Sequence, residues 1–154
     1  MNYCIDTSAL IGAWIRWYPQ EMFPSLWERV DTLIDDDRLI SSEEVLHELE
    51  RKEGDTLHEW AKERHEVFLP LGDDIQTCAS QIMTTHPRLV DGRTGKSFAD
   101  PWVIATAHTH KAIVVTEEKP TGKRDRPKIP DVCRDMQVDC ISFVDLIRQE
   151  EWRF

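Results

Sequence analysis

The sequence has 154 residues, the length of one ordinary domain, and we expect residues 1–154 to fold as a single unit. Hydrophobic residues make up 40% of the chain and charged residues 31%, a composition that excludes intrinsic disorder. The net charge of −10 argues at first against a nucleic-acid partner, because phosphates are bound through Lys and Arg.

The sequence carries no targeting or membrane signal. Its first residues, MNYCIDTSAL, include an acid at position 6 and lack the basic and apolar regions of a signal peptide. No apolar run approaches the roughly 18 residues of a membrane helix. We therefore expect a cytoplasmic protein, in which four Cys residues without a CxxC pair stay as thiols and bind no structural zinc.

The basic residues are concentrated in one part of this acidic chain. Residues 1–85 contain 18 acids and 7 bases, whereas residues 86–128 contain 5 acids and 9 bases. A phosphate group responds mainly to charges within a Debye length, so local charge decides whether RNA can approach. The basic stretch predicts a nucleic-acid contact if it lies beside the catalytic residues, and a solvated loop if it does not.

In the first half of the chain, hydrophobic periodicity and capping residues predict strands alternating with helices. In chain order these are a strand at 2–6, a helix carrying Leu10 and closed by Pro19, a helix opened by a Ser25/Glu28 capping box and ending near Asp36, a strand at 39–40, a helix opened by Ser41 and Glu44, and a polar helix at 55–66.

The second half continues the alternation. It consists of an extended segment at 67–71, an amphipathic helix at 75–83, a surface loop at 86–96, a helix at 99–110, a strand at 112–116, a basic loop at 119–130, a strand at 138–141 and a helix from Ser142 to about Glu150. Strands alternating with helices predict a three-layer α/β/α sandwich around a mainly parallel sheet. Ligand sites in such sheets lie at the carboxyl ends of the strands.

Four acids fall where such a sheet would bring them together: Asp6 ends the first strand, Glu48 lies on the third helix, Asp100 opens a helix and Glu118 follows a strand. Each also has an ordinary interpretation. Asp6 and Asp100 are suited to helix N-caps, which favour Asp. Glu48 fits a solvated helix face and Glu118 an exposed loop, the usual places for Glu.

The four segments together resemble the PIN-domain nucleases, including VapC-type toxins of toxin–antitoxin pairs. The segments are IDTSAL at the N-terminus, VLHEL at 45–49, ADPWVIATA at 99–107 and VVTEE at 114–118. The resemblance covers about residues 2–118 and implies that Asp6, Glu48, Asp100 and Glu118 are the catalytic residues and metal ligands. Glu117 is an alternative to Glu118, and Glu43 and Glu44 are alternatives to Glu48. The basic loop at 119–130 is longer than in simple VapC toxins, which indicates a less familiar PIN-like subgroup.

Clustered carboxylates repel one another and need a cation, and sites made only of oxygen ligands suit Mg²⁺ or Mn²⁺. The resemblance therefore implies a metal-dependent endoribonuclease that hydrolyses RNA phosphodiesters, with 5′-phosphate and 3′-hydroxyl products. It also implies that the chain is the toxin of a toxin–antitoxin pair, with an antitoxin as partner, and that it forms homodimers.

Residues beside the acids complete the predicted site. Thr7 and Thr116 are interpreted as hydroxyl donors that orient carboxylates, with plain capping as the alternative. His108 and His110 are two positions apart on a helix and face different sides, so we do not expect them to bind metal. The residues expected to contact RNA are basic and flank the acids: Arg88, Arg93, Lys96, Lys119, Lys123, Arg124 and Arg126.

Two other functions remain open. A haloacid-dehalogenase-like phosphatase also begins with a strand ending in Asp, but it requires D-x-D, and Ser8 occupies the second position here. A catalytically silent module that keeps the PIN fold and binds protein or RNA is compatible with the same sequence. The six tryptophans are better explained by core or partner packing than by base stacking, since most lie on amphipathic helices.

Overall fold

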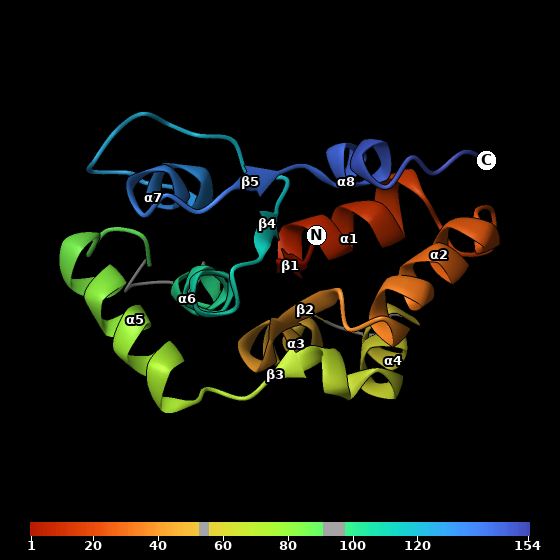
Figure 1. Ribbon diagram of the computed structural model, residues 1–154, viewed down its shortest axis with the longest axis horizontal. Helices are drawn as coiled ribbons and strands as arrows, with labels where there is room; N and C mark the ends of the chain where they lie inside the picture. Colours follow the sequence, from red (N-terminus) through yellow and green to blue (C-terminus); the bar gives the residue numbers. More distant parts are fainter. Residues whose placement is uncertain (53–55, 91–97) are drawn as a thin grey trace.

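The computed structural model describes residues 1–52, 56–90 and 98–154 (Figure 1). The strands are β1 (Tyr3–Ile5), β2 (Leu39–Ser42), β3 (Phe68–Leu69), β4 (Ile113–Val115) and β5 (Cys140–Ile141). The helices are α1 (Thr7–Ile11), α2 (Pro24–Asp35), α3 (Glu43–Arg51), α4 (Thr56–Glu63), α5 (Asp73–Thr85), α6 (Asp100–His110), α7 (Ile129–Asp135) and α8 (Phe143–Gln149). A π-helical segment, η1 (Gly12–Trp17), continues α1, and a 3₁₀ turn, η2 (His65–Val67), precedes β3.

The strands form one parallel sheet in the order β3-β2-β1-β4-β5. Tyr3 of β1 is in register with Leu39 of β2 and with Ile113 of β4, so β1 is the central strand. In Figure 1, α5, α6 and α7 lie on one side of the sheet, and α1, α2 and α8 lie on the other. This arrangement confirms the predicted α/β/α sandwich, and all of its described strand pairs are parallel.

Aromatic packing closes the core at the end of the molecule that contains α2 and α4. The rings of Trp14, Trp27 and Trp60 pack together, with centroids 4.8 Å apart for Trp14 and Trp27 and 5.5 Å apart for Trp27 and Trp60. These three side chains and Trp152 are buried, which confirms core packing for them, whereas Trp17 is 44% exposed. Burying these rings stabilises the fold by more than the buried apolar area alone would give, because edge-to-face aromatic pairs are favourable.

The predicted start of the second helix is wrong. Phe23 is the N-cap of α2, makes no side-chain cap, and is followed by Pro24 in the first turn. Proline at that position presets the helical backbone and needs no hydrogen-bonding N–H, so the helix begins before the Ser25/Glu28 pair can cap it.

The predicted cap of the third helix is displaced by one residue. Ser42 is the N-cap of α3, and its Oγ accepts the N–H of Glu44. Ser41 instead belongs to β2, where its buried hydroxyl donates a 2.6 Å hydrogen bond to the carbonyl of Ile5 in β1. Two adjacent serines make the register ambiguous from sequence, and the pairing of β1 with β2 decides it.

A helix stands where the sequence pattern predicts only a loop. The basic segment 119–130 does not extend to the last strand, because α7 begins at Ile129. Pro130 fits the first turn of this helix, and Asp131 accepts the N–H of Lys128, the residue that precedes it. With seven residues, α7 is too short for hydrophobic periodicity to reveal it.

Within the described ranges, no helix combines the length and the hydropathy that a membrane span requires.

Candidate functional site

Two of the predicted site segments meet at the carboxyl ends of β1 and β4. The N–H of Asp6 donates to the carbonyl of Val115 at 3.0 Å, and the N–H of Thr116 donates to the carbonyl of Ile141 at 2.9 Å. Parallel strands end at the same edge of a sheet, so the residues after β1 and β4 become neighbours although they are distant in sequence.

Asp6 is almost fully enclosed at this edge, with 2% of its surface exposed. Its Oδ1 accepts the N–H of Ala9 at 2.8 Å, which makes Asp6 the N-cap of α1. The hydroxyl of Thr116 donates to Oδ2 at 2.6 Å, and the hydroxyl of Ser8 lies 2.9 Å from both carboxylate oxygens. Asp6 therefore caps α1 and is also a member of the candidate site.

The carboxyl group of Asp6 has a pKa raised to about 7. Burial is the main cause, because an ionised carboxylate loses its hydration at this position. Hydrogen bonds from Thr116 and Ala9 oppose the shift, and the negative charge of Glu118 adds to it. Without a cation, keeping Asp6 ionised in the folded protein therefore costs considerable free energy.

Glu48 and Asp100 approach the same edge from α3 and α6. Glu48 is half-buried and accepts a hydrogen bond from the N–H of Ala99, the residue before Asp100. Burial raises the pKa of Glu48; Lys52 and the Ala99 N–H oppose the shift, while Glu118 adds to it. Asp100 is buried and is the first residue of α6, and Ala99 takes the N-cap position, so the alternative interpretation of Asp100 as an N-cap is wrong.

The structure distinguishes Glu118 from Glu117. Glu117 turns to α8, where its Oε1 accepts the N–H of Phe143 at 2.8 Å. Glu118 turns to α7, where its Oε1 accepts the N–H of Ile129 at 3.1 Å. The charge of Glu118 raises the pKa of both Asp6 and Glu48, so Glu118 is the acid that links the two.

At the third helix, Glu44 lies 3.5 Å from the ring of His47, on its own helix. Glu48, by contrast, contacts the start of α6 through Ala99. This difference favours Glu48 as the member of the candidate site, and its role as a ligand stays a prediction.

The donor set matches a hard divalent cation in its chemistry, because it consists of carboxylate oxygens, two of which have raised pKa values. Among the residues that the structure describes, no three Asp, Glu, His or Cys side chains are grouped closely enough to form a ready metal site. Asp6 and Glu118 are turned instead to hydrogen-bond donors of the protein. Metal binding by these residues therefore stays a prediction.

Ser8 has the role that the sequence suggested for Thr7. The Thr7 hydroxyl is buried and makes no hydrogen bond among the described residues. Ser8 contacts both oxygens of Asp6, lies 3.2 Å from the Thr116 hydroxyl and accepts the N–H of Glu117 at 3.1 Å. The signal for Ser8 was its place two residues after a strand-ending acid, where a Ser hydroxyl commonly turns back to the chain.

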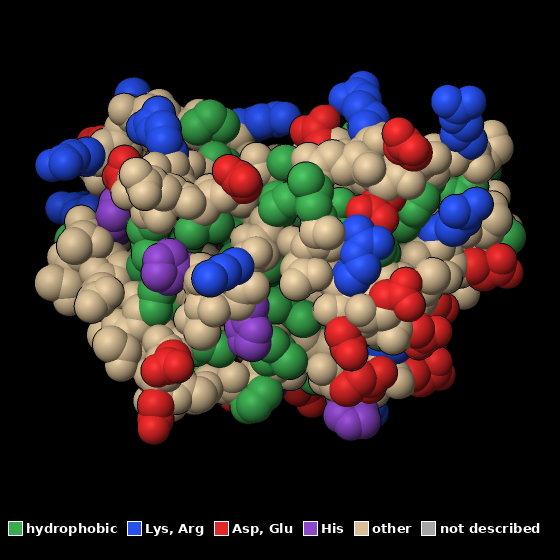
Figure 2. Space-filling view, viewed as in Figure 1, with side chains coloured by type: hydrophobic (Ala, Val, Ile, Leu, Met, Phe, Trp, Pro, Cys, Tyr) green, Lys and Arg blue, Asp and Glu red, His purple; other side chains and the backbone are tan. Residues whose placement is uncertain are grey.

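The residues predicted to contact RNA are exposed where the structure describes them. Arg88, Lys119, Lys123, Arg124 and Arg126 are all exposed, whereas Arg93 and Lys96 lie outside the described residues. Figure 2 shows Lys and Arg side chains gathered over α7 and the loop before it, and Asp and Glu side chains gathered at the opposite end of this face. The loop begins directly after Glu118, so part of the basic surface is continuous with the acidic edge.

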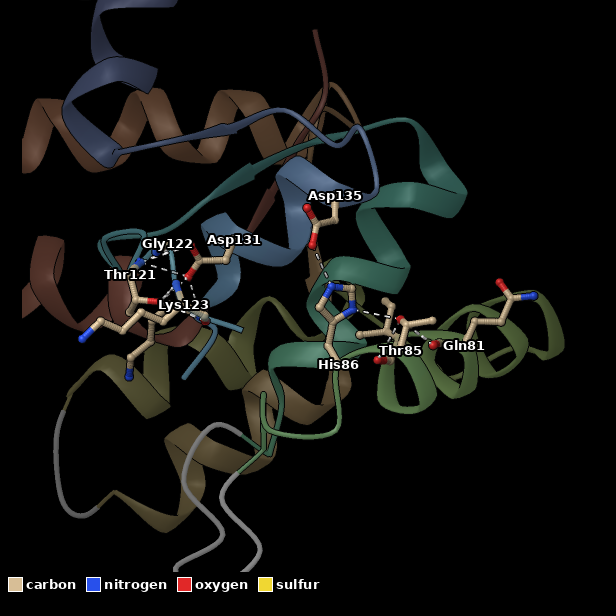
Figure 3. A network of polar contacts seen from close by, with 10 residues as sticks. Gln81, Thr85, His86, Thr121, Gly122, Lys123, Asp131 and Asp135 are labelled. Atoms are coloured by element: carbon tan, nitrogen blue, oxygen red, sulfur yellow. Dashed lines mark hydrogen bonds and ion pairs between the residues drawn. The ribbon is translucent and has the colours of Figure 1, made fainter. Parts of the chain in front are cut away.

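Asp131 holds this basic loop in one conformation. Its carboxylate accepts the N–H groups of Thr121, Gly122 and Lys128 at distances between 2.8 and 3.1 Å, and also the Thr121 hydroxyl (Figure 3). Burial pushes the pKa of Asp131 upward, but these hydrogen bonds outweigh it and lower the pKa to about 2.

Replacing Asp131 with Asn is expected to lower the free energy of unfolding by about 2–4 kcal/mol, because an amide group would face backbone N–H donors. The folded pKa lies below the usual value, so the stabilisation of about 2 kcal/mol from ionisation exists above pH ~4 and is lost as the pH falls through ~2. Urea unfolding at pH 7 and pH 3 measures this difference. Asp125→Asn, at an exposed position of the same loop, is the control and should change stability little. Equal effects of the two variants at pH 7 would contradict the assigned role.

Comparisons with known proteins place this geometry in a family. No curated protein matches the sequence significantly. The fold is similar to that of a chain in the crystal structure of VapBC2 from Rickettsia felis bound to a DNA fragment from their promoter, with a TM-score of 0.58 and 16% identity over 93% of this chain and 99% of that chain. Residues 3–154 match the family model described as Domain of unknown function (DUF4411). The chain therefore belongs to the DUF4411 family and has a PIN-like fold, similar to that of the matched chain of the VapBC2 structure.

Proposed function

We propose that the chain is a single PIN-like nuclease domain that hydrolyses RNA phosphodiesters with Mg²⁺ or Mn²⁺ held by Asp6, Glu48, Asp100 and Glu118. One observation carries the proposal: the Thr116 hydroxyl donates to the Asp6 carboxylate at 2.6 Å and accepts the N–H of Glu118 at 3.1 Å. Glu48 in turn accepts the N–H of Ala99, the residue before Asp100. Carboxylates that are at least partly buried and lie near one another at the carboxyl edge of a parallel sheet form a site that a cation stabilises.

The chemistry follows from the residues around that edge. A bound divalent ion would lower the pKa of a water molecule and stabilise the charge that develops on a phosphodiester. Ser8, Thr116 and the Ala9 N–H fix the orientation of the Asp6 carboxylate. Thr116 also accepts the N–H of Glu118 at 3.1 Å, so a single hydroxyl positions two of the proposed ligands.

The basic loop after Glu118 supports a polyanionic substrate. Its exposed Lys and Arg side chains stand next to an acidic edge that would otherwise repel RNA. We propose single-stranded RNA as the substrate, because basic side chains beside the acidic edge can bind the phosphates of one strand.

The partners follow from the likeness to a chain of the VapBC2 structure. We infer that this chain acts as a toxin held in check by an antitoxin protein, and that it forms homodimers. Coexpression with the product of an adjacent gene, followed by copurification and a cleavage assay, tests the first inference.

The activity itself is tested by metal removal. Purified protein with Mn²⁺ is expected to cleave an unstructured oligoribonucleotide, whereas the same protein in EDTA is expected to be inactive, with activity restored by excess Mn²⁺. A gel assay of end-labelled RNA measures the rate. Absence of cleavage under all metals, by a folded protein that still binds RNA, would favour the catalytically silent module.

A further inference from the structure

A basic pocket lies beside the basic loop, away from the proposed catalytic acids. It has a volume of about 210 Å³ and is lined by His86 after α5, by Lys123 and Arg124 of the loop, and by Arg134, Asp131 and Asp135 of α7. Figure 3 shows how α7 is fixed on both sides of it: Asp131 binds the loop, and Asp135 binds His86. Two regions that are distant in sequence, His86 and the stretch 122–135, thus converge on one hollow.

The two carboxylates of the pocket are already occupied by the protein. Asp131 accepts backbone N–H groups of the loop, and Asp135 accepts from the ring of His86 at 2.9 Å. Lys123, Arg124 and Arg134 form no ion pair among the described residues. The lining therefore has three cations against two carboxylates, and Asp135 lies close enough to Arg124 and Arg134 to offset part of their charge.

The loop backbone that carries the cations is held in place before any ligand binds. Asp131 fixes Thr121 and Gly122, and the Thr121 hydroxyl donates to the carbonyl of Arg126 at 2.8 Å and accepts the N–H of Lys123 at 3.1 Å. Gly122 has φ +69°, a conformation that a side chain would strain. Because these bonds order the backbone of the loop, little backbone entropy remains to be lost there when an anion binds.

The size and charge of the pocket point to its ligand. Pockets that enclose drug-sized molecules have volumes of roughly 300–1,000 Å³, so this one suits a single small anion better than a base or a whole nucleotide. Guanidinium groups such as those of Arg124 and Arg134 match the oxygens of a phosphate. The loop also connects this pocket directly to Glu118 at the acidic edge.

We propose that this pocket binds a backbone phosphate of the RNA strand, at a distance from the bond that is cut. The proposal rests on the proposed nuclease function and adds a second, metal-independent contact to it. Such a contact would fix the strand relative to the acids without taking part in the chemistry.

The pocket is tested first with inorganic phosphate alone, in EDTA. The wild type and Arg153→Gln, a variant of an exposed arginine near the C-terminus, are expected to show saturable shifts of the Gly122 amide signal in NMR titrations, beyond those caused by chloride at equal ionic strength. Arg134→Gln should bind phosphate at least about 10-fold more weakly. Equal binding by Arg134→Gln and Arg153→Gln, or no saturable shift in the wild type, would overturn the pocket whatever the protein does to RNA.

RNA binding in EDTA then identifies the source of the phosphate. Arg134→Gln is expected to reduce the slope of log affinity against log salt concentration by about one, equally for 5′-phosphorylated and 5′-hydroxyl oligonucleotides, while Arg153→Gln keeps the wild-type slope. If Arg134→Gln reduces the slope only for the 5′-phosphorylated RNA, the pocket binds the 5′-terminal phosphate and the assignment to a backbone phosphate is wrong. If phosphate binds but the wild type neither binds nor cleaves RNA, the nuclease function fails and the anion pocket stands without it.

Discussion

Asp6→Asn is expected to abolish RNA cleavage and, in the absence of metal, to raise the Tm of the protein. Cleavage should fall by at least about 1,000-fold, since an amide cannot replace a carboxylate that holds the cation. The stability gain arises because burial and the charge of Glu118 raise the pKa of Asp6 to about 7. At pH 8 the wild type must keep that buried group ionised, and the variant avoids up to about 4 kcal/mol of this cost.

The raised pKa of Asp6 also determines how the stability gain of Asp6→Asn depends on pH. A carboxyl group with a raised folded pKa destabilises the protein at high pH, and the penalty disappears as the pH falls from ~7 towards ~4. The Tm advantage of Asp6→Asn over the wild type should therefore shrink between pH 8 and pH 5. Asp100→Asn should lose cleavage in the same way, and the exposed Asp125→Asn should lose none. An Asp6→Asn protein that is less stable than the wild type at pH 8, or that still cleaves RNA, would contradict the proposed role of Asp6.

Thr116→Val is expected to lower kcat/KM for RNA cleavage by about 10- to 100-fold. The acidic limb of the pH profile, where activity rises with pH, is expected to move to higher pH. The Thr116 hydroxyl donates to Asp6 at 2.6 Å and accepts the N–H of Glu118 at 3.1 Å, so its loss releases both acids. Its hydrogen bond also lowers the pKa of Asp6, and without it that pKa rises further. Rates measured over a series of pH values at several Mn²⁺ concentrations separate weakened metal binding from slower cleavage.

Two further variants separate positioning from simple packing. Thr116→Ser keeps the hydroxyl and should recover most of the activity. Thr106→Val is the matched control, because the Thr106 hydroxyl is fully buried and makes no hydrogen bond among the described residues. Its replacement should leave cleavage unchanged and stability equal or higher. If Thr106→Val lost as much activity as Thr116→Val, the role of Thr116 would be one of packing alone.

The layers of the fold were predictable because they follow from strong patterns. Short apolar runs such as Ile113–Val115 are typical of central strands, and helices between such strands favour parallel pairing. Local boundaries were less predictable, because tertiary contacts decide them. Ser41 and Ser42 are equally good caps by residue type, and the contact of Ser41 with Ile5 settles the choice.

The candidate site shows the same division. Its four acids could be named from sequence because the segments that carry them resemble one family, and the charge of one of them, Glu118, acts on Asp6 and on Glu48 in the structure. The contact of Ser8 with Thr116 and the bridge from His86 to Asp135 depend on how elements pack. No pattern within a single segment encodes contacts between residues from different elements.

The most direct test of the account is the location of manganese in crystals grown with Mn²⁺, found by anomalous diffraction. The account predicts a strong peak at the carboxyl edge of the sheet, in direct contact with Asp6 and with at least two of Glu48, Asp100 and Glu118. A protein that cleaves RNA with Mn²⁺ but binds the ion elsewhere, with Asp6 still held only by Ser8, Ala9 and Thr116, would contradict it.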